Sequence, residues 1–490
     1  MIKWKNSCVL IFILFSFVLI HHTGAESEFE KWKKQELGDF QEFKDKRDKE
    51  FTRYLKRQWK EFTLFAGAKI YEKPKPVRVP RAPSQKAADK EKSFQGTKIE
   101  KIPAQAPPKP TPKKEPVGQK IEGRSVTITF FGQSLDIPYD PAMKLTIKGS
   151  IDKNNISSFW ETLSKASYEN TVHAIHTYKN DLQLNDWGYY FLIYKMGEAL
   201  YGKENANETT LLAWFILSKS GYEARIGYNE NKVNLLLPSH TTLYAVPFIK
   251  LDGKKYYAIS FDETKKQLGA LYTYKGSYPE ADRVMDTSIQ FSPNITHIPS
   301  TKNLSFDYQG KRYEIPVTFN AELIEFFRFY PQTNFEVYFQ APVSDEATES
   351  LLNGLRPYIG GKSEGEAVNF LLHFVQTAFE YKTDDAQFGR EKYMLSEETL
   401  YYPFSDCEDR SILFAFLVRK LTGLSVIGLH YPNHLATAVK FTDPLEGDSI
   451  LANGIRYIIC DPTYINADIG MAMPQFKNEK PKVIYFHEST

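Results

Sequence analysis

The sequence predicts an α+β protein with several domains, and three observations support this fold class. At 490 residues the chain is longer than one hydrophobic core normally organises, so we expect about two to four domains. Runs rich in β-branched and aromatic residues, such as 125–131, occur beside apolar runs of helix-forming residues, such as 411–421. Turn-forming residues separate neighbouring strand-like runs, which favours antiparallel sheets.

Residues 1–25 have the pattern of a secretory signal peptide. Lys3 and Lys5 precede an apolar run over 8–20, and the small residues of 23–25 offer a cleavage site. We therefore predict an exported protein, periplasmic or secreted. An uncleaved anchor is the alternative, although the apolar run is short for a membrane span.

Residues 26–72 are predicted to form a long amphipathic helix. Aromatic residues recur there with a period of eleven, which is close to three helical turns and places them on one stripe. The stripe consists of Phe29, Trp32, Phe40, Phe43, Phe51, Tyr54, Phe62 and Phe65. Because such a stripe is a packing face, we expect a docking element outside the catalytic fold. It would bind a partner protein, a second copy or the protein's own domains, and a membrane surface is the alternative.

Residues 73–121 have the composition of a disordered linker. Proline and lysine are frequent, as in Lys73-Pro74-Lys75-Pro76, and no apolar periodicity is present. We expect an extended, solvated tether with polyproline stretches.

The formal net charge of the chain is only +2, so overall charge gives no argument for a nucleic-acid partner, and none is predicted.

Residues 122–300 are predicted to form an α+β domain. Its apolar stretch 210–221 matches 412–423 at an offset of 202 residues, which places Asn205 at the position of Cys407. A degenerate copy of the C-terminal core would explain this match, and chance similarity between two apolar helices is the alternative. Strands are expected over 242–251 and 254–260.

Residues 301–345 are predicted to be a β-rich connecting segment, and residues 346–490 a second α+β domain. Alternating patterns predict strands over 304–308, 311–318 and 334–341. A helix is expected over 364–382. Its predicted buried face consists of Phe370, Leu371, Phe374, Val375 and Phe379.

Cys407 lies at the start of a predicted helix. The apolar run 411–421 continues it, Ser405 or Asp406 can cap it, and Gly423 can end it. The positive end of a helix dipole favours the thiolate form of a cysteine. Neighbouring carboxylates oppose this effect, so an imidazolium is needed nearby. They belong to Asp406, Glu408 and Asp409.

His434 and Asp461 are predicted to meet across two strands. The strand-like runs 435–441 and 455–460 are separated by turn-forming residues, with His434 at the start of the first and Asp461 at the end of the second. The carboxylate would then hold the imidazole in one tautomer while the other ring nitrogen faces Cys407. Thiol, imidazole and carboxylate are the parts of an activated cysteine nucleophile.

In these motifs, roughly residues 345–490 resemble the bacterial branch of the transglutaminase-like superfamily. The resemblance rests on the stretch 406–410 with its apolar helix, on His434 leading a strand, and on 461–463 ending the next strand. It implies a papain-like fold, in which a helix carrying the cysteine packs on an antiparallel sheet carrying histidine and aspartate. It also implies acyl transfer from a protein or peptide carboxamide through a thioester, to an amine or to water. We expect the catalytic residues to be Cys407, His434 and Asp461.

Residues 384–403 are polar, rich in tyrosine and lead into Cys407, so we expect them to line a substrate cleft. Gln387 or Tyr402 could help the Cys407 backbone N–H to bind an oxyanion. No organic cofactor or metal is predicted. A zinc site made by His430, His434 and Cys407 is a weaker alternative, because it lacks paired-cysteine spacing.

Cys460 is the other cysteine beyond the signal peptide. A disulfide with Cys407 is the simple reading for an exported protein. Adjacent strand residues face opposite sides of a sheet, however, so if Asp461 faces the site then Cys460 faces away. We expect a free, buried thiol.

A non-enzymatic envelope scaffold or binding protein with the same fold is the rival function.

Overall fold

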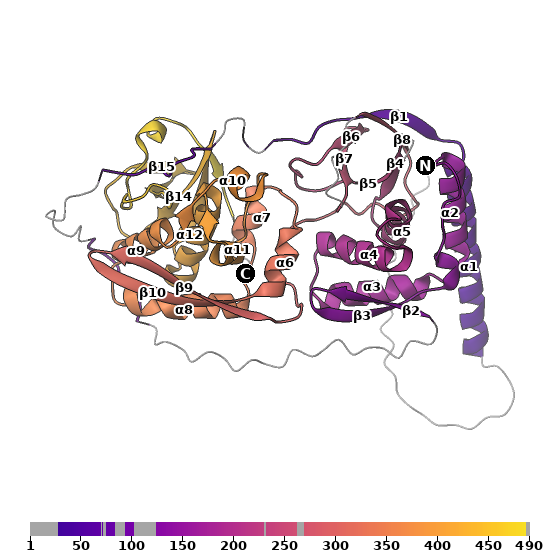
Figure 1. The fold of residues 1–490 in the computed structure, drawn as a ribbon, viewed down its shortest axis with the longest axis horizontal. Coiled ribbons are helices and arrows are strands. Elements are labelled where there is room, and N and C mark those ends of the chain that lie inside the picture. Colours follow the sequence, from indigo (N-terminus) through magenta and orange to yellow (C-terminus); the bar gives the residue numbers. More distant parts are fainter. Residues whose placement is uncertain are drawn as a thin grey trace, which may run out of the picture. The chain divides into compact units, whose positions relative to one another are not determined.

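The computed structural model describes residues 28–69, 71, 75–83, 94–101, 124–229, 232–261 and 269–486. The predicted signal peptide lies outside these residues. The chain divides into two compact units, Met1–Glu50 and Phe51–Thr490. The described part of the first unit belongs to helix α1, and the second unit contains the sheets and the candidate site (Figure 1).

The predicted N-terminal helix is shorter than the aromatic pattern suggests. Helix α1 covers Glu28–Leu55, and strand β1 (Trp59–Leu64) follows it. β1 pairs with strand β8 (Gly269–Tyr274) along its whole length, so the helical prediction is wrong after Leu55. The segment 59–65 contains three aromatic residues and one threonine, which suit a strand once a partner is present. The prediction that residues 26–121 lie outside the folded domains is therefore wrong for β1.

The first part of the second unit combines helices with a near-closed, six-stranded antiparallel barrel. A hairpin and four helices precede most of its strands: β2 (Ser125–Phe130), β3 (Gln133–Pro138), α2 (Lys153–Lys165), α3 (Glu169–Asp181), α4 (Asp186–Tyr201) and α5 (Ala206–Lys219). The barrel has the strand order β1-β8-β4-β5-β7-β6. The remaining bounds are β4 (Arg225–Tyr228), β5 (Val233–Leu237), β6 (Phe248–Leu251) and β7 (Lys254–Ile259).

A β-hairpin and three helices connect the two sheets. Strands β9 (Pro299–Tyr308) and β10 (Lys311–Asn320) confirm two predicted strands. The predicted strand 334–341 is wrong, because this segment forms helix α7 (Phe335–Gln340), flanked by α6 (Ala321–Arg328) and α8 (Asp345–Ile359). The apolar residues of this segment are all buried. In so short a run, the pattern of apolar and polar residues does not distinguish a helix from a strand.

The C-terminal part begins with α9 (Glu364–Thr377), so the predicted helix 364–382 is wrong after Thr377. The five residues of the predicted buried face are all buried, although Phe379 lies beyond the end of the helix. Two short helices, α10 (Asp384–Phe388) and α11 (Ser396–Tyr401), lead to α12 (Cys407–Thr422). Five antiparallel strands then curl into a half-barrel with the order β15-β16-β14-β13-β17. Their bounds are β13 (Ser425–Tyr431), β14 (His434–Lys440), β15 (Ser449–Ala452), β16 (Ile455–Cys460) and β17 (Lys482–Ile484).

The two sheets repeat one another in topology and register. Each follows an apolar helix, α5 or α12, and β8-β4-β5-β7-β6 in the first sheet corresponds to β17-β13-β14-β16-β15 in the second. Corresponding strand pairs also match in register: Arg225–Leu236 with Ile427–Ala438, Leu235–Ile259 with Thr437–Cys460, and Phe248–Tyr257 with Ser449–Ile458. This repeated topology is what a duplicated core would produce, and it is independent of the helix similarity in the sequence.

The two repeats also share a tight turn between their last two paired strands, β6–β7 and β15–β16, so the same substitution can be compared at both turns. Gly253 and Gly454 both have left-handed backbone angles (φ +80° and +76°), and no atom lies within 4 Å of where a Cβ would stand. An alanine at either position would therefore be penalised by backbone conformation alone. We expect Gly253→Ala and Gly454→Ala each to lower the free energy of unfolding by about 1 kcal/mol. Urea unfolding would measure both changes. If the loss of unfolding free energy were several times larger at one turn than at the other, the two turns would not be equivalent.

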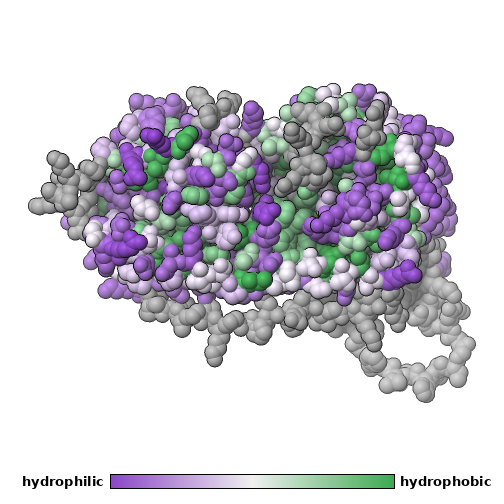
Figure 2. Space-filling view, in the orientation of Figure 1, coloured by the Kyte–Doolittle hydropathy of each residue, from purple (hydrophilic) through white to green (hydrophobic). Residues whose placement is uncertain are grey.

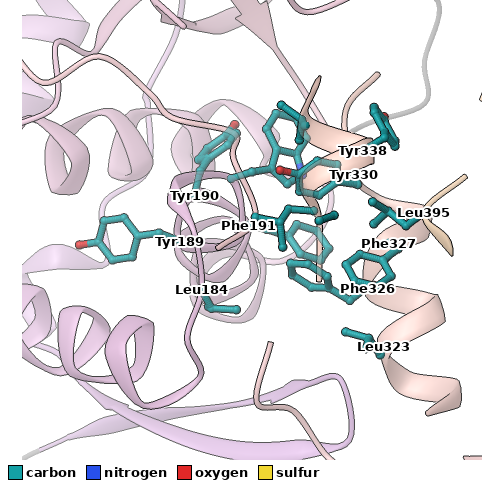
Figure 3. Close-up of a cluster of buried hydrophobic side chains, with 14 of the residues drawn as sticks. Leu184, Tyr189, Tyr190, Phe191, Leu323, Phe326, Phe327, Tyr330, Tyr338 and Leu395 are labelled. Carbon is teal, nitrogen blue, oxygen red and sulfur yellow. The ribbon is translucent and has the colours of Figure 1, made fainter. Parts of the chain in front are cut away.

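One aromatic cluster packs α4 of the first repeat against the segment that connects the two repeats. Figure 3 shows side chains of α4, including Phe191, pointing toward those of α6, including Phe326. The rings of Phe191 and Phe329 stack with centroids 5.1 Å apart, and the indole N–H of Trp187 donates to the Phe329 carbonyl at 2.9 Å. These contacts place both repeats in one hydrophobic core.

The surface is mostly hydrophilic on the face drawn in Figure 2, with apolar side chains in smaller groups. Isolated exposed apolar residues of this kind are ordinary for a folded protein. Among the described residues, no helix combines the length and the apolar character needed to cross a bilayer.

Candidate active site

Helix α12 places Cys407 at its first residue, as the sequence predicts. Asp406 is the N-cap residue, and Gly423 ends the helix in a left-handed conformation (φ +71°). The Ser411 hydroxyl donates to the Leu435 carbonyl at 2.9 Å, which fixes the first turns of α12 against β14. The first turns of α12 therefore lie beside the start of β14, the strand that His434 begins (Figure 1).

His434 and Asp461 form a buried hydrogen-bonded pair. The distance between His434 Nε2 and Asp461 Oδ2 is 2.8 Å. Asp461 Oδ1 accepts from the backbone N–H groups of Thr463 and Tyr464 at 2.9 and 3.2 Å, and the imidazole stacks on Phe476 with an interplanar angle of 3°. The carboxylate thus fixes the ring and assigns it the tautomer with a proton on Nε2, which leaves Nδ1 as an acceptor.

The predicted strands β14 and β16 are adjacent, but their connection is longer than a simple hairpin. Thr437 lies opposite Cys460, and β15 intervenes in the chain and pairs with the other edge of β16. The turn-forming residues that suggested one hairpin instead separate three strands.

The Cys407 thiol is hydrogen-bonded to a carboxylate. Its Sγ donates to Glu408 Oε2 at 2.9 Å, and among the described residues no hydrogen bond joins Cys407 to His434. Burial, then the charges of Glu408 and Asp406, raises the pKa of Cys407 well above its usual range. In this arrangement Cys407 is a neutral thiol with 1 % of its surface exposed.

The carboxylates beside Cys407 surround a buried lysine. Lys75 Nζ lies 2.6 Å from Asp406 Oδ2, 2.6 Å from Glu408 Oε1, 2.6 Å from Glu391 Oε1 and 3.2 Å from Asp384 Oδ2. We call these four carboxylates the acidic pocket. Glu408 bridges the two groups, because one of its oxygens accepts from Lys75 and the other from Cys407.

The acidic pocket holds more negative charge than one ammonium neutralises. Burial, followed by the charge of Asp406, raises the pKa of Asp384 to about 8. Burial and neighbouring carboxylates likewise raise the pKa values of Glu408 and Asp409. Burial alone would lower the pKa of Lys75, but the carboxylates of the pocket raise it, so the ammonium stays charged.

These raised pKa values predict stability that decreases with rising pH. Asp384, Glu408 and Asp409 hold protons in the folded state that the unfolded chain releases near pH 4. Their stabilising contribution is therefore complete below about pH 4 and is lost as the pH rises toward the folded pKa, about 8 for Asp384. We expect the melting temperature to fall between pH 5 and pH 8. Asp384→Asn should make the dependence shallower, and a melting temperature that rises over this range would contradict the assignment.

Several of these carboxylates lie close enough together to hold a cation. The nearest groups, with ligand atoms within 4.8 Å of one another, are Asp384 with Asp406 and Asp409, Asp384 with Glu391 and Glu408, and Asp406 with Cys407 and Glu408. In this structure the Lys75 ammonium supplies positive charge at this place. His430 and His434, the histidines of the zinc alternative, belong to none of these groups, and burial lowers the pKa of His430 to about 4.

The described contacts of Gln387 and Tyr402 are with residues other than the three predicted catalytic ones, although Gln387 shares α10 with Asp384 of the acidic pocket. Gln387 lies in α10, where its backbone N–H donates to the Thr383 carbonyl. The Tyr402 ring packs on Phe388 with centroids 5.2 Å apart. In the described part of the chain, neither side chain has a recorded hydrogen bond or ring contact with the three predicted catalytic residues.

Cys460 is a free, buried cysteine, as is Cys407. It ends β16 and lies in the main hydrophobic core, and burial raises the pKa of its thiol. This agrees with the strand-parity argument that Cys460 and Asp461 face opposite sides of the sheet.

Lys75, Asp384 and Glu391 belong to the site but are not predicted from the sequence. Lys75 lies in the predicted linker, of which residues 75–83 and 94–101 are described and are held against the C-terminal part by hydrogen bonds. A lysine in a run of lysines and prolines carries no local signal of burial. The excess of acid around Cys407 was the one available indication that a cation must lie nearby.

A scan against protein-family models finds no match, and searches of curated proteins and of solved structures find none. The resemblance to transglutaminase-like proteins therefore rests on the sequence motifs alone.

Proposed function

We propose that the C-terminal part is a transglutaminase-like thiol hydrolase or acyltransferase that acts on protein or peptide carboxamides. The observation that carries this proposal is the buried His434–Asp461 pair at 2.8 Å, where β14 begins and β16 ends in the sheet against which the Cys407 helix packs. A carboxylate that orients an imidazole beside the first turn of a helix carrying cysteine is the arrangement that thiol activation needs.

The proposed reaction has two steps. His434 takes the thiol proton as Cys407 Sγ attacks the carboxamide carbon, and the same proton then leaves with the amine as the C–N bond breaks. The product is a thioester on Cys407 and a released ammonia or amine. Water or a second amine then attacks the thioester, loses its proton to His434, and the S–C bond breaks to restore the thiol. No cofactor is required by this chemistry.

A second candidate function, a binding or scaffold protein without catalysis, is favoured by a different observation. Cys407 is buried, its thiol donates to Glu408 and its pKa is raised, which are properties of an unreactive cysteine. A scaffold role requires no change in this arrangement, whereas catalysis requires the thiol to exchange Glu408 for His434.

The test is to incubate the protein with a library of glutamine-containing peptides and to measure ammonia release and peptide cleavage together. We expect ammonia release that is abolished by Cys407→Ala and kept by Cys460→Ala, the matched change at the other buried thiol. Release that survives Cys407→Ala would refute the proposed nucleophile. Absence of turnover at every peptide, also in a variant in which residues 75–82 are displaced, would favour the scaffold function.

A further inference from the structure

The acidic pocket is occupied by a lysine that comes from far away in the sequence. Lys75 is 4 % exposed at its side chain, and Asp384, Asp406 and Glu408 are 1 % exposed or less. Its ammonium donates to all three of these residues. Three hydrogen bonds match the three protons of one ammonium group, so the pocket is shaped for a primary ammonium.

The pocket also keeps an unused acceptor. Asp406 Oδ1 is completely buried and has no hydrogen-bond partner among the described residues. A buried carboxylate oxygen without a partner is costly in a folded protein, so this acceptor is left for a donor group of a ligand.

Residues 75–82, which we call the strap, are held mainly through the backbone. The Tyr381 hydroxyl donates to the Pro76 carbonyl at 2.8 Å. Ile465 N donates to the Pro80 carbonyl at 3.0 Å, and Ala82 N donates to the Ile465 carbonyl at 2.8 Å. These hydrogen bonds recognise an extended backbone and not particular side chains. Another extended peptide could therefore form them.

The strap also borders the cavity beside the histidine. A cavity of about 230 Å³ is lined by Pro76 and Pro80 of the strap together with His434 and Thr463. The Thr463 hydroxyl is buried and unpartnered among the described residues, so a polar group that could contact a ligand is left there. A molecule that reaches His434 through this cavity meets the strap.

We propose that the acidic pocket is a binding site for the ammonium group of a lysine carried on an extended peptide, and that the strap is its resident occupant. The strap closes the site in cis, and a lysine-containing peptide of similar backbone conformation competes with it in trans. The proposal concerns binding and does not require Cys407 to be catalytic.

The experiment measures the rate of Cys407 alkylation by iodoacetamide at pH 7.5 in the full chain, resolved by peptide mass mapping. Ala82→Asp places a charge among the buried residues Tyr464, Ala467 and Met473, so it should displace the strap without touching the acidic pocket. We expect the rate to rise about tenfold or more, because labelling follows the open population. Val77→Asp is the matched control, since Val77 belongs to the strap but is 84 % exposed, and its rate should equal that of the unchanged protein.

The ligand class is tested by adding a synthetic peptide of residues 75–83 to the Ala82→Asp protein. We expect the peptide to restore protection of Cys407, and the same peptide with Lys75→Met to fail. Equal protection by both peptides would overturn the ammonium site. Lys75→Met in the full chain is the second variant, and it should also accelerate labelling. If both chain variants remain folded and label at the unchanged rate, the closing role of the strap is refuted, whatever the outcome of the ammonia assay.

Discussion

Arg410→Met is expected to lower the free energy of unfolding by about 3–5 kcal/mol. Arg410 is almost completely buried and makes three hydrogen bonds, to Ser405 Oγ at 3.0 Å, to the Gln376 carbonyl at 3.1 Å and to the Phe379 carbonyl at 2.8 Å. Methionine keeps much of the aliphatic volume but leaves these acceptors without the guanidinium. Urea unfolding at pH 7 measures the loss.

Arg456→Met is the matched control. Arg456 also makes three hydrogen bonds, to Ser449 Oγ and to the carbonyls of Leu445 and Gly447, but it is exposed. Water replaces those bonds, so we expect a loss below about 1 kcal/mol. Equal losses in the two variants would show that burial does not determine the contribution of Arg410.

Asp461→Asn is expected to reduce ammonia release by about 10²–10⁴-fold with little change in stability. The asparagine oxygen can still accept from Thr463 N and Tyr464 N, so the local turn should persist. Its NH₂ group would face His434 Nε2 and would favour the tautomer with a proton on Nδ1. The imidazole could then no longer take the thiol proton.

Asp468→Asn serves as the matched control for this prediction. Asp468 accepts from a second histidine, His373, at 2.9 Å, but neither residue lines the cavity beside His434. Ammonia release should be unchanged in this variant. A loss as large as that of Asp461→Asn would show that the assay reports a general effect of disrupting a histidine–aspartate pair.

The sequence predicted the parts of the site that local patterns encode. The helix that begins at Cys407, the strand that begins at His434 and the strand before Asp461 each have periodicity and turn residues that act over a few positions. The pairing of His434 with Asp461 followed from the order of these elements. The contact between Cys407 and His434 remains a prediction.

Other features depend on long-range contacts that no local pattern reports. Phe62 continues the aromatic stripe of α1, yet it pairs in a sheet with Leu271, more than two hundred residues away. Lys75 belongs to a stretch typical of linkers, yet its burial is decided by carboxylates that the fold brings together from α10 and the start of α12. Tertiary contacts of this kind override local propensity.

The most direct test of the proposed function is detection of a thioester on Cys407. The unchanged protein and the Ala82→Asp variant would be mixed with the glutamine peptides, quenched in acid within seconds and examined by peptide mass mapping. We predict an acyl adduct on Cys407 that neutral hydroxylamine removes and that Asp461→Asn forms far more slowly. An adduct on another residue, or none in either protein while ammonia is still released, would contradict the assignment of Cys407 as the nucleophile.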